Sequence, residues 1–156
     1  MINTAPVAPP RWEAHVTVAA IVERGGRFLI VEERINGQLL FNQPAGHLEA
    51  NESLVEACVR EVKEETGWTV EPVGVVGWYQ YYSRTINVTY VRTAFAARPL
   101  QGDPNAELDT GIVAAHWLDL KELETTRERH RSPLVLACVR DYLGGTLFPL
   151  DSVRRY

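Results

Sequence analysis

Three glutamates are crowded near the end of one amphipathic stretch of this sequence. Glu61, Glu64 and Glu65 lie within "REVKEETGW", just before a glycine typical of a helix end. The C-terminal end of a helix favours cations, so three carboxylates there are repelled by one another and by the helix dipole. Carboxylate oxygens are the ligands that Mg²⁺ prefers, and Mg²⁺ commonly joins them to substrate phosphates. The spacing therefore indicates divalent-cation chemistry on a phosphate compound.

A solvated, charged helix face is the alternative interpretation of such a segment. Against it, the nearest positive side chains are only Arg60 and Lys63. In the loop before the helix, Gly46 permits a tight turn and could bring its carbonyl oxygen close to a cation. Arg60 can brace the neighbouring Glu61 carboxylate through its fork of donors. These features favour the metal interpretation.

The order of these residues resembles a known motif. Gly46, Glu52 and the run from Arg60 to Trp68 match every fixed position of the Nudix box, Gly-x5-Glu-x7-Arg-Glu-U-x-Glu-Glu-x-Gly-U, where U is a bulky aliphatic residue. Trp68 at the last apolar position is the one departure, and it concerns packing. The resemblance implies an α+β fold, an α/β/α sandwich with a mixed β-sheet between helices. It also implies metal-dependent cleavage of a diphosphate linked to another moiety.

The same resemblance assigns roles by position. It implies that Glu61, Glu64 and Glu65 are ligands of Mg²⁺ or Mn²⁺, with the Gly46 carbonyl as a further ligand. Arg60 would orient Glu61. Arg60 and the three glutamates are thus the catalytic candidates.

Acids outside this helix complete the expected site. Glu52 would be a supporting acid tied to the loop. Nudix enzymes place the general base on a box glutamate or on an acid in a later loop, so Glu61, Glu107 and Asp109 are the candidates. Asp109 is also a candidate metal ligand. Plain loop surface is the alternative for Glu107 and Asp109.

Four further residues are candidates for binding the substrate. His47 follows the turn glycine and could touch a phosphate, although a loop histidine need have no such role. Arg92 is expected on a central strand, where an arginine needs a partner, either substrate phosphate or a structural acid. Tyr79 could stack on a base or pack in the core. Arg131 opens "RSPLV", where a helix N-terminus either holds an anion or is simply capped.

Runs rich in β-branched and aromatic residues predict the strands of the sheet. Glycine, proline and asparagine pairs mark the turns between them. The expected strands are 15–23, 27–34, 38–41, 73–83, 86–98 and 112–118, and the expected long loops are 42–52 and 99–111.

Capping signals predict three helices. Ser53 and Glu56 form a capping box before the glutamate-bearing helix, and Gly67 ends it. The apolar stripe of this helix should face the sheet with the acids beside it; it consists of Val55, Cys58, Val59 and Val62. A short capped helix is expected from Asp119, and the last helix runs from Ser132-Pro133 to Gly144-Gly145.

Composition bounds the protein class. A chain of 156 residues predicts one domain, and a net charge of −4 gives no support for binding a nucleic-acid polymer. No signal peptide is evident and no apolar stretch approaches the ~20 residues that span a bilayer, so we expect a cytoplasmic protein without membrane contact, monomeric or homodimeric. Cys58 and Cys138 favour buried free thiols over a disulfide. The expected division is a flexible arm (1–12), the domain (13–145) and a tail (146–156).

Sequence outside the box resembles the bacterial NudJ-type phosphatases, in "HVTVAAIVE", "NQPAGHLEANESLVEA" and "RSPLV". That resemblance implies removal of terminal phosphate from nucleoside di- and triphosphates and from pyrophosphates of the thiamine pathway. We therefore expect a metal-dependent hydrolase of small diphosphate compounds. The alternatives are a Nudix-fold domain that binds a nucleotide without cleaving it, and a pyrophosphatase of ADP-ribose or dinucleoside polyphosphates. Ser83 stands near where the ADP-ribose group carries a proline, which disfavours the ADP-ribose alternative.

Overall fold

The computed structural model describes residues 12–156, and the arm expected over residues 1–12 lies outside them except for Trp12. The described residues form seven strands, three α-helices and two short 3₁₀ turns. The strands are β1 (His15–Arg24), β2 (Arg27–Ile35), β3 (Gln38–Asn42), β4 (Ala45–His47), β5 (Trp68–Ser83), β6 (Val88–Gly102) and β7 (Ile112–Asp119). The helical elements are α1 (Leu54–Thr66), α2 (Leu120–Thr125), η1 (Arg127–Arg129), α3 (Leu134–Leu143) and η2 (Leu150–Ser152).

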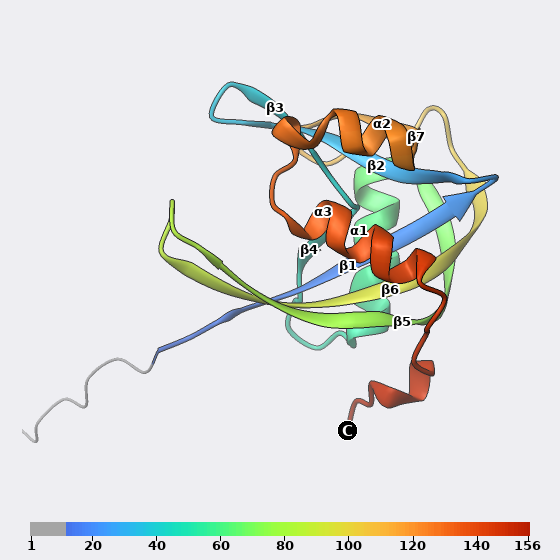
Figure 1. Ribbon diagram of the computed structural model, residues 1–156. Coiled ribbons are helices and arrows are strands. Elements are labelled where there is room, and N and C mark those ends of the chain that lie inside the picture. Colours follow the sequence, from blue (N-terminus) through green and yellow to red (C-terminus); the bar gives the residue numbers. More distant parts are fainter. Residues whose placement is uncertain (1–11) are drawn as a thin grey trace, which may run out of the picture.

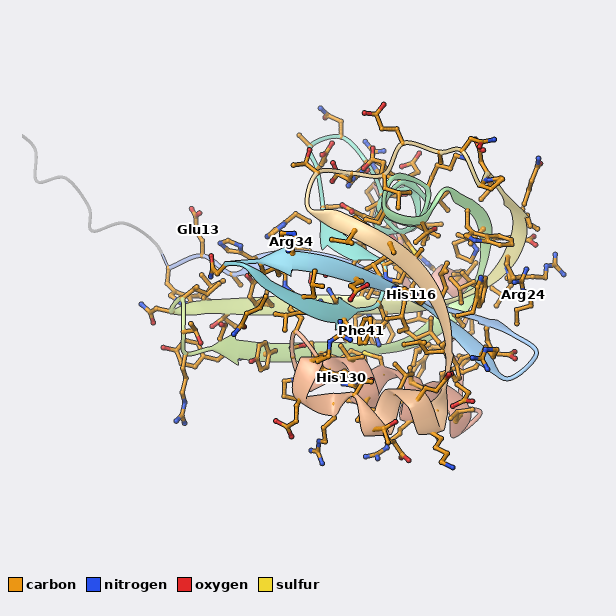
Figure 2. All side chains as sticks on the ribbon, turned by 90° about the horizontal axis from the view of Figure 1, so that it is seen from above. Glu13, Arg24, Arg34, Phe41, His116 and His130 are labelled. Carbon is orange, nitrogen blue, oxygen red and sulfur yellow. The ribbon has the colours of Figure 1, made fainter. Side chains whose placement is uncertain are left out.

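The sheet is mixed and lies between helices, which confirms the expected α/β/α sandwich. Its central path is β3-β2-β1-β6-β5, with β4 paired to β1 and β7 paired to β2. Only the β1–β6 pair is parallel among the strand pairs of the described residues. Helix α1 lies on one side of the sheet and α3 on the other (Figure 1), and the view from above shows the same layering (Figure 2). One apolar cluster fills each side, with Val62 in the α1 cluster and Val135 in the α3 cluster.

Helix α1 begins and ends where the sequence predicts. The Ser53 hydroxyl accepts a hydrogen bond from the Glu56 amide at 3.1 Å, and the Glu56 carboxylate accepts one from the Ser53 amide at 2.7 Å. Gly67 adopts a left-handed φ of 71°, which a glycine tolerates at little cost. The buried face includes Cys58 and Val62. The capping box and the terminal glycine therefore fix the register of the three glutamates on the helix.

The structure corrects three expected boundaries. Residues 45–47, expected as loop, form β4, because Ala45–His47 pairs with β1 despite the glycine in its middle. Strand β5 begins at Trp68 and not at residue 73: Pro72 keeps its place opposite Ala97, and a register shift follows it between Pro72 and Gly74. Strand β6 starts at Val88 and extends to Gly102, so the loop expected from 99 is shorter.

Trp68, the one departure from the box pattern, has a packing role. Its ring meets that of Trp117 edge to face, with centroids 5.4 Å apart. The Arg24 guanidinium lies over both rings, 5.0 Å from the Trp68 centroid and 4.4 Å from the Trp117 centroid. Trp68 therefore fixes the end of α1 against β7 through aromatic and cation–π contacts.

The last residues pack on the domain. Phe148 exchanges two backbone hydrogen bonds of 2.8 Å with Val75, and Leu150 and Val153 pack against the apolar cluster under α1. Cys58 and Cys138 are free and buried, one in each cluster. Within residues 12–156, no helix is both long and apolar enough to cross a membrane.

Candidate active site

Strand β4 places Gly46 directly against the glutamate-bearing helix. Gly46 pairs with Val18 of β1, so its position is fixed by the sheet. The Glu61 carboxylate occupies the space where a side chain on residue 46 would lie, and a methyl group there would overlap both carboxylate oxygens. Only glycine allows this close approach. The structure therefore brings Gly46 and Glu61 together, as the sequence predicts.

Arg60 is the centre of the charged cluster. Its Nη1 donates to Glu61 at 2.8 Å and to Glu64 at 3.1 Å. Its Nε and Nη2 donate to Glu52 at 3.0 and 2.8 Å, and Nη2 also donates to the His47 carbonyl at 3.0 Å. The hydrogen bonds that Arg60 donates to Glu52 are the largest cause that raises the pKa of Arg60 above its ordinary value, and those to Glu61 and Glu64 add to it. Arg60 thus holds the helix and the loop after β4 in one arrangement.

The remaining acids differ in burial. Glu52 accepts a hydrogen bond from the Glu49 amide at 2.7 Å, which ties it to the loop. Glu65 is buried and accepts one from the Ala45 amide at 2.8 Å. Burial raises the pKa of Glu65 to about 8, and burial also raises that of Glu61 against the opposing hydrogen bond from Arg60. The Glu64 side chain, in contrast, is 48% exposed.

The loop before β7 reaches the end of α1. The Asp109 amide donates to the Glu64 carbonyl at 2.9 Å, and the negative charge of Asp109 contributes to the raised pKa of Glu61. Glu107 is exposed and does not line the cavity described below. Of the two loop acids considered as bases, only Asp109 therefore lies at the candidate site.

Within residues 12–156, no three histidine, cysteine, aspartate or glutamate side chains are already gathered as a metal-ligand set. Arg60 lies between Glu61 and Glu64, while Glu65 turns toward β4. The Glu61 and Glu64 carboxylates nevertheless converge on one nitrogen atom, Arg60 Nη1, and the Glu61 carboxylate lies beside Gly46. The hard oxygen donors present there fit Mg²⁺ or Mn²⁺. The full ligand set stays a prediction.

A cavity of about 650 Å³ unites most of the predicted site residues. Its lining includes Gly46, His47, Arg60, Glu61, Glu64, Glu65, Arg92, Asp109 and Arg131. This volume is in the range that holds a nucleotide-sized ligand. Residues far apart in the sequence therefore form one chamber, with the acids at one part of its wall.

Tyr79 does not line this chamber, so its sequence-based assignment to substrate binding stays a prediction that the cavity does not support. Its hydroxyl donates to Asp141 of α3 at 2.8 Å, and its ring packs against the α3 cluster. Burial raises the pKa of Tyr79. Tyr81, two residues further along β5, lines the cavity instead. The aromatic run correctly predicted a strand. Which of its tyrosines faces α3 and which faces the cavity depends on where α3 packs, and the sequence of the strand does not show this.

The other three substrate-binding candidates all line the cavity, but they differ in the partners of their side chains. His47 Nε2 lies 3.0 Å from His15 Nδ1, and its ring is also near Tyr90. Arg131 is paired with the buried Glu33. Arg92 is 9% exposed, and its side-chain Nε and Nη1 atoms have no hydrogen-bond partner among the described residues. The structural acid considered as a partner for Arg92 is therefore not bonded to it.

Comparisons with known proteins agree with this geometry. A family model described as the NUDIX domain matches residues 13–137. The chain is 40% identical over 142 residues to Phosphatase NudJ of Escherichia coli strain K12, covering 91% of this chain and 92% of that protein. A NUDIX hydrolase structure from Nitrosomonas europaea is 42% identical, with a TM-score of 0.90, and the match covers 92% of this chain and 98% of that one.

A more distant structure shares the fold alone. It is an ADP-ribose pyrophosphatase from Streptococcus suis, 22% identical with a TM-score of 0.63, and the match covers 83% of this chain and 92% of that one. The matched family model spans the glutamate helix, β4 and the cavity-lining strands. The chain therefore belongs to the Nudix hydrolase family, as its box residues predicted, and is a pyrophosphohydrolase or phosphatase acting on phosphate-containing substrates.

Proposed function

We propose that this enzyme is a Mg²⁺- or Mn²⁺-dependent phosphatase. Its proposed substrates are nucleoside di- and triphosphates, pyrimidine pyrophosphates of the thiamine pathway, or both. One observation carries the metal dependence: the Glu61 and Glu64 carboxylates converge on one Arg60 nitrogen at the wall of a substrate-sized cavity, and Glu61 lies against Gly46. The 40% identity to a phosphatase supports release of phosphate.

The residues that would hold the cation are Glu61, Glu64 and Glu65, with the Gly46 carbonyl and Asp109 as further candidates. Glu61 and Glu64 both accept hydrogen bonds from Arg60 Nη1, so these two carboxylates would be available together to a cation. The hydrogen bonds from Arg60 to Glu52 and to the His47 carbonyl do not involve these carboxylates and would still hold Arg60 near the site. A bound divalent cation neutralises phosphate charge and lowers the pKa of the attacking water.

The chain's own residues supply the remaining requirements of hydrolysis. The water oxygen forms a bond to phosphorus as the anhydride P–O bond breaks, and the water proton passes to a carboxylate. Glu61 and Asp109 both line the cavity and are the two candidates for this proton acceptor. His47 and Arg131, also on the cavity wall, would bind or orient phosphate oxygens.

The cell compartment and assembly remain proposals of the same kind. Two buried free thiols, Cys58 and Cys138, suit a reducing compartment, so we place the enzyme in the cytoplasm. We propose a small-molecule diphosphate or nucleotide as its partner and no nucleic-acid polymer, consistent with the net charge of −4. A monomer or a homodimer would satisfy this function equally.

Metal removal tests the proposed activity. The purified chain is incubated with nucleoside di- and triphosphates, ADP-ribose, thiamine diphosphate and its pyrimidine precursor, with Mg²⁺ or with EDTA. We expect inorganic phosphate to be released with Mg²⁺ and release to fall to background with EDTA, because the glutamates alone cannot neutralise the substrate. Separate detection of pyrophosphate and of nucleoside monophosphate identifies the bond that is cleaved. Equal release with and without EDTA would contradict metal dependence, and no release from any compound would favour a binding domain without turnover.

A further inference from the structure

One end of the cavity lies on the sheet face that α3 covers. Arg92 of β6 is directly opposite Thr17 of β1. Tyr90, two residues before Arg92, is directly opposite Tyr81 of β5. Residues opposite one another in a ladder, and residues two apart on a strand, share a face of the sheet. All four side chains therefore project from one face, and all four line the cavity.

At this end of the cavity, the side chains of Arg92, Asn42 and Thr17 form a polar floor whose buried atoms lack hydrogen-bond partners. Arg92 Nε and Nη1, Asn42 Oδ1 and Thr17 Oγ1 are buried and have no hydrogen-bond partner among the described residues. Buried polar groups are nearly always hydrogen-bonded in folded proteins, because an unpaired group loses its water without replacement. Two donors and two acceptors left unpaired beside one cavity therefore suggest a ligand with acceptors and donors of its own.

Part of the charge around this floor is already compensated, because Arg131 is paired with the buried Glu33. Burial is the main cause that lowers the pKa of Arg92; Arg131 lowers it further, while Glu33 and Glu65 act in the opposite direction. A phosphate at this floor would add negative charge beside the buried Glu33 carboxylate, whose Oε1 also has no hydrogen-bond partner among the described residues. A neutral acceptor, such as a ring nitrogen or a carbonyl oxygen, can accept a hydrogen bond from Arg92 without that repulsion.

The walls above the floor suit a flat apolar surface. Tyr81 and Tyr90 provide aromatic rings, and Leu40 and Leu134 provide aliphatic side chains. A phosphate group needs no such walls, whereas a heteroaromatic ring stacks against them with its polar edge free. Walls and floor together match a ring whose edge carries an acceptor next to a donor.

We propose that Arg92, Asn42 and Thr17 form a recognition subsite for the heterocyclic ring of the substrate. The ring-edge acceptor accepts a hydrogen bond from Arg92, and a neighbouring amino or imino group donates to Asn42 Oδ1. Tyr81 and Tyr90 hold the faces of the ring. This inference rests on the proposed function, in which the acid cluster at Gly46 receives the phosphate end of the same molecule. Because these atoms are closed to solvent here, we expect the two polar side chains to turn toward the ring when it binds.

A comparison of substrates with and without a ring tests this subsite. With Mg²⁺ present, kcat and KM are measured for CTP, ATP and inorganic tripolyphosphate, using the wild type, Arg92→Met and Asn42→Leu. We expect the KM for CTP or ATP to rise at least about tenfold in each variant, with tripolyphosphate changed less than about threefold. Arg98→Met is the matched control, because Arg98 is on the same strand but is exposed and paired with Glu71; it should leave all three substrates unchanged. An equal loss with tripolyphosphate would show that Arg92 binds phosphate and would overturn the proposal.

Two readouts do not depend on turnover. Thermal unfolding should place the Tm of Arg92→Met at or above that of the wild type, since the substitution removes a buried charge without unpairing any protein group. A lower Tm together with unchanged KM values would assign Arg92 a structural role and overturn the proposal. Binding of cytidine and adenosine in EDTA, followed by NMR saturation transfer, should be visible for the wild type and lost in Arg92→Met. Absence of nucleoside binding to the wild type would also overturn the subsite, whereas nucleoside binding without hydrolysis would reject the proposed function alone.

Discussion

Glu64→Gln is expected to lower kcat by about 100-fold or more with Mg²⁺, without loss of folded structure. The substitution keeps the shape of the side chain and removes its charge. Residues that only support a metal ligand are worth about 10- to 100-fold, so a ligand itself should be worth at least the upper end of that range. The Glu64 side chain is 48% exposed, and among the described side chains it is hydrogen-bonded only to Arg60. Its replacement should therefore cost little stability, and steady-state kinetics over a range of Mg²⁺ concentrations measures the loss.

The chain offers a closely matched control for this substitution. The Glu71 side chain is 50% exposed and paired with Arg98, but it is on β5 and does not line the cavity. Glu71→Gln removes the same charge at the same exposure and should retain wild-type turnover. If Glu64→Gln also retained wild-type turnover at limiting Mg²⁺, the assignment of the acid cluster would be wrong.

Gly46→Ala should lower kcat about as much as Glu64→Gln, because it would displace the Glu61 carboxylate without removing any charge. A methyl group at residue 46 overlaps the Glu61 carboxylate, and that carboxylate is the end of a flexible side chain that can move away. The backbone of Gly46 is outside the positive-φ region, so alanine fits the local conformation. We expect the free energy of unfolding to change by less than about 1 kcal/mol. A displacement of about 1 Å at a reacting group can cost about 100-fold in rate, and we expect a kcat reduction of that size.

Gly144→Ala provides the comparison for Gly46→Ala. Gly144 ends α3 with a φ of −63°, where alanine is allowed, and it does not line the cavity. Its replacement should leave kcat unchanged. Wild-type kcat in Gly46→Ala, measured on protein with an intact unfolding transition, would show that the approach of Glu61 to residue 46 has no part in the reaction.

Local signals in the sequence were sufficient for α1 and its register. The Ser53–Glu56 box, the terminal Gly67 and the apolar spacing act within a few residues of one another, so they determine the helix without distant contacts. The start of β5 and the whole of β4 were missed for the opposite reason. Pro72 and Gly46 discourage strands locally, but pairing with β6 and β1 overrides that preference.

The site was predictable in part for a similar reason. Gly46, Arg60, the three helix glutamates and Asp109 line one cavity, whereas Tyr79 is bonded to α3. Asn42 and Thr17 gave no signal in the sequence, because a polar residue near a strand end is ordinary. Only the packed sheet shows that their oxygen atoms are buried without partners beside Arg92.

The central claim is that the acids around Gly46 take up a divalent cation. Titration calorimetry of Mn²⁺ into the wild-type chain, in the presence of a non-hydrolysable nucleotide, tests it most directly. We predict saturable uptake that is weakened at least about tenfold in Glu64→Gln and unchanged in Glu71→Gln. No uptake of Mn²⁺ by the wild type, with the nucleotide or without it, would contradict the claim.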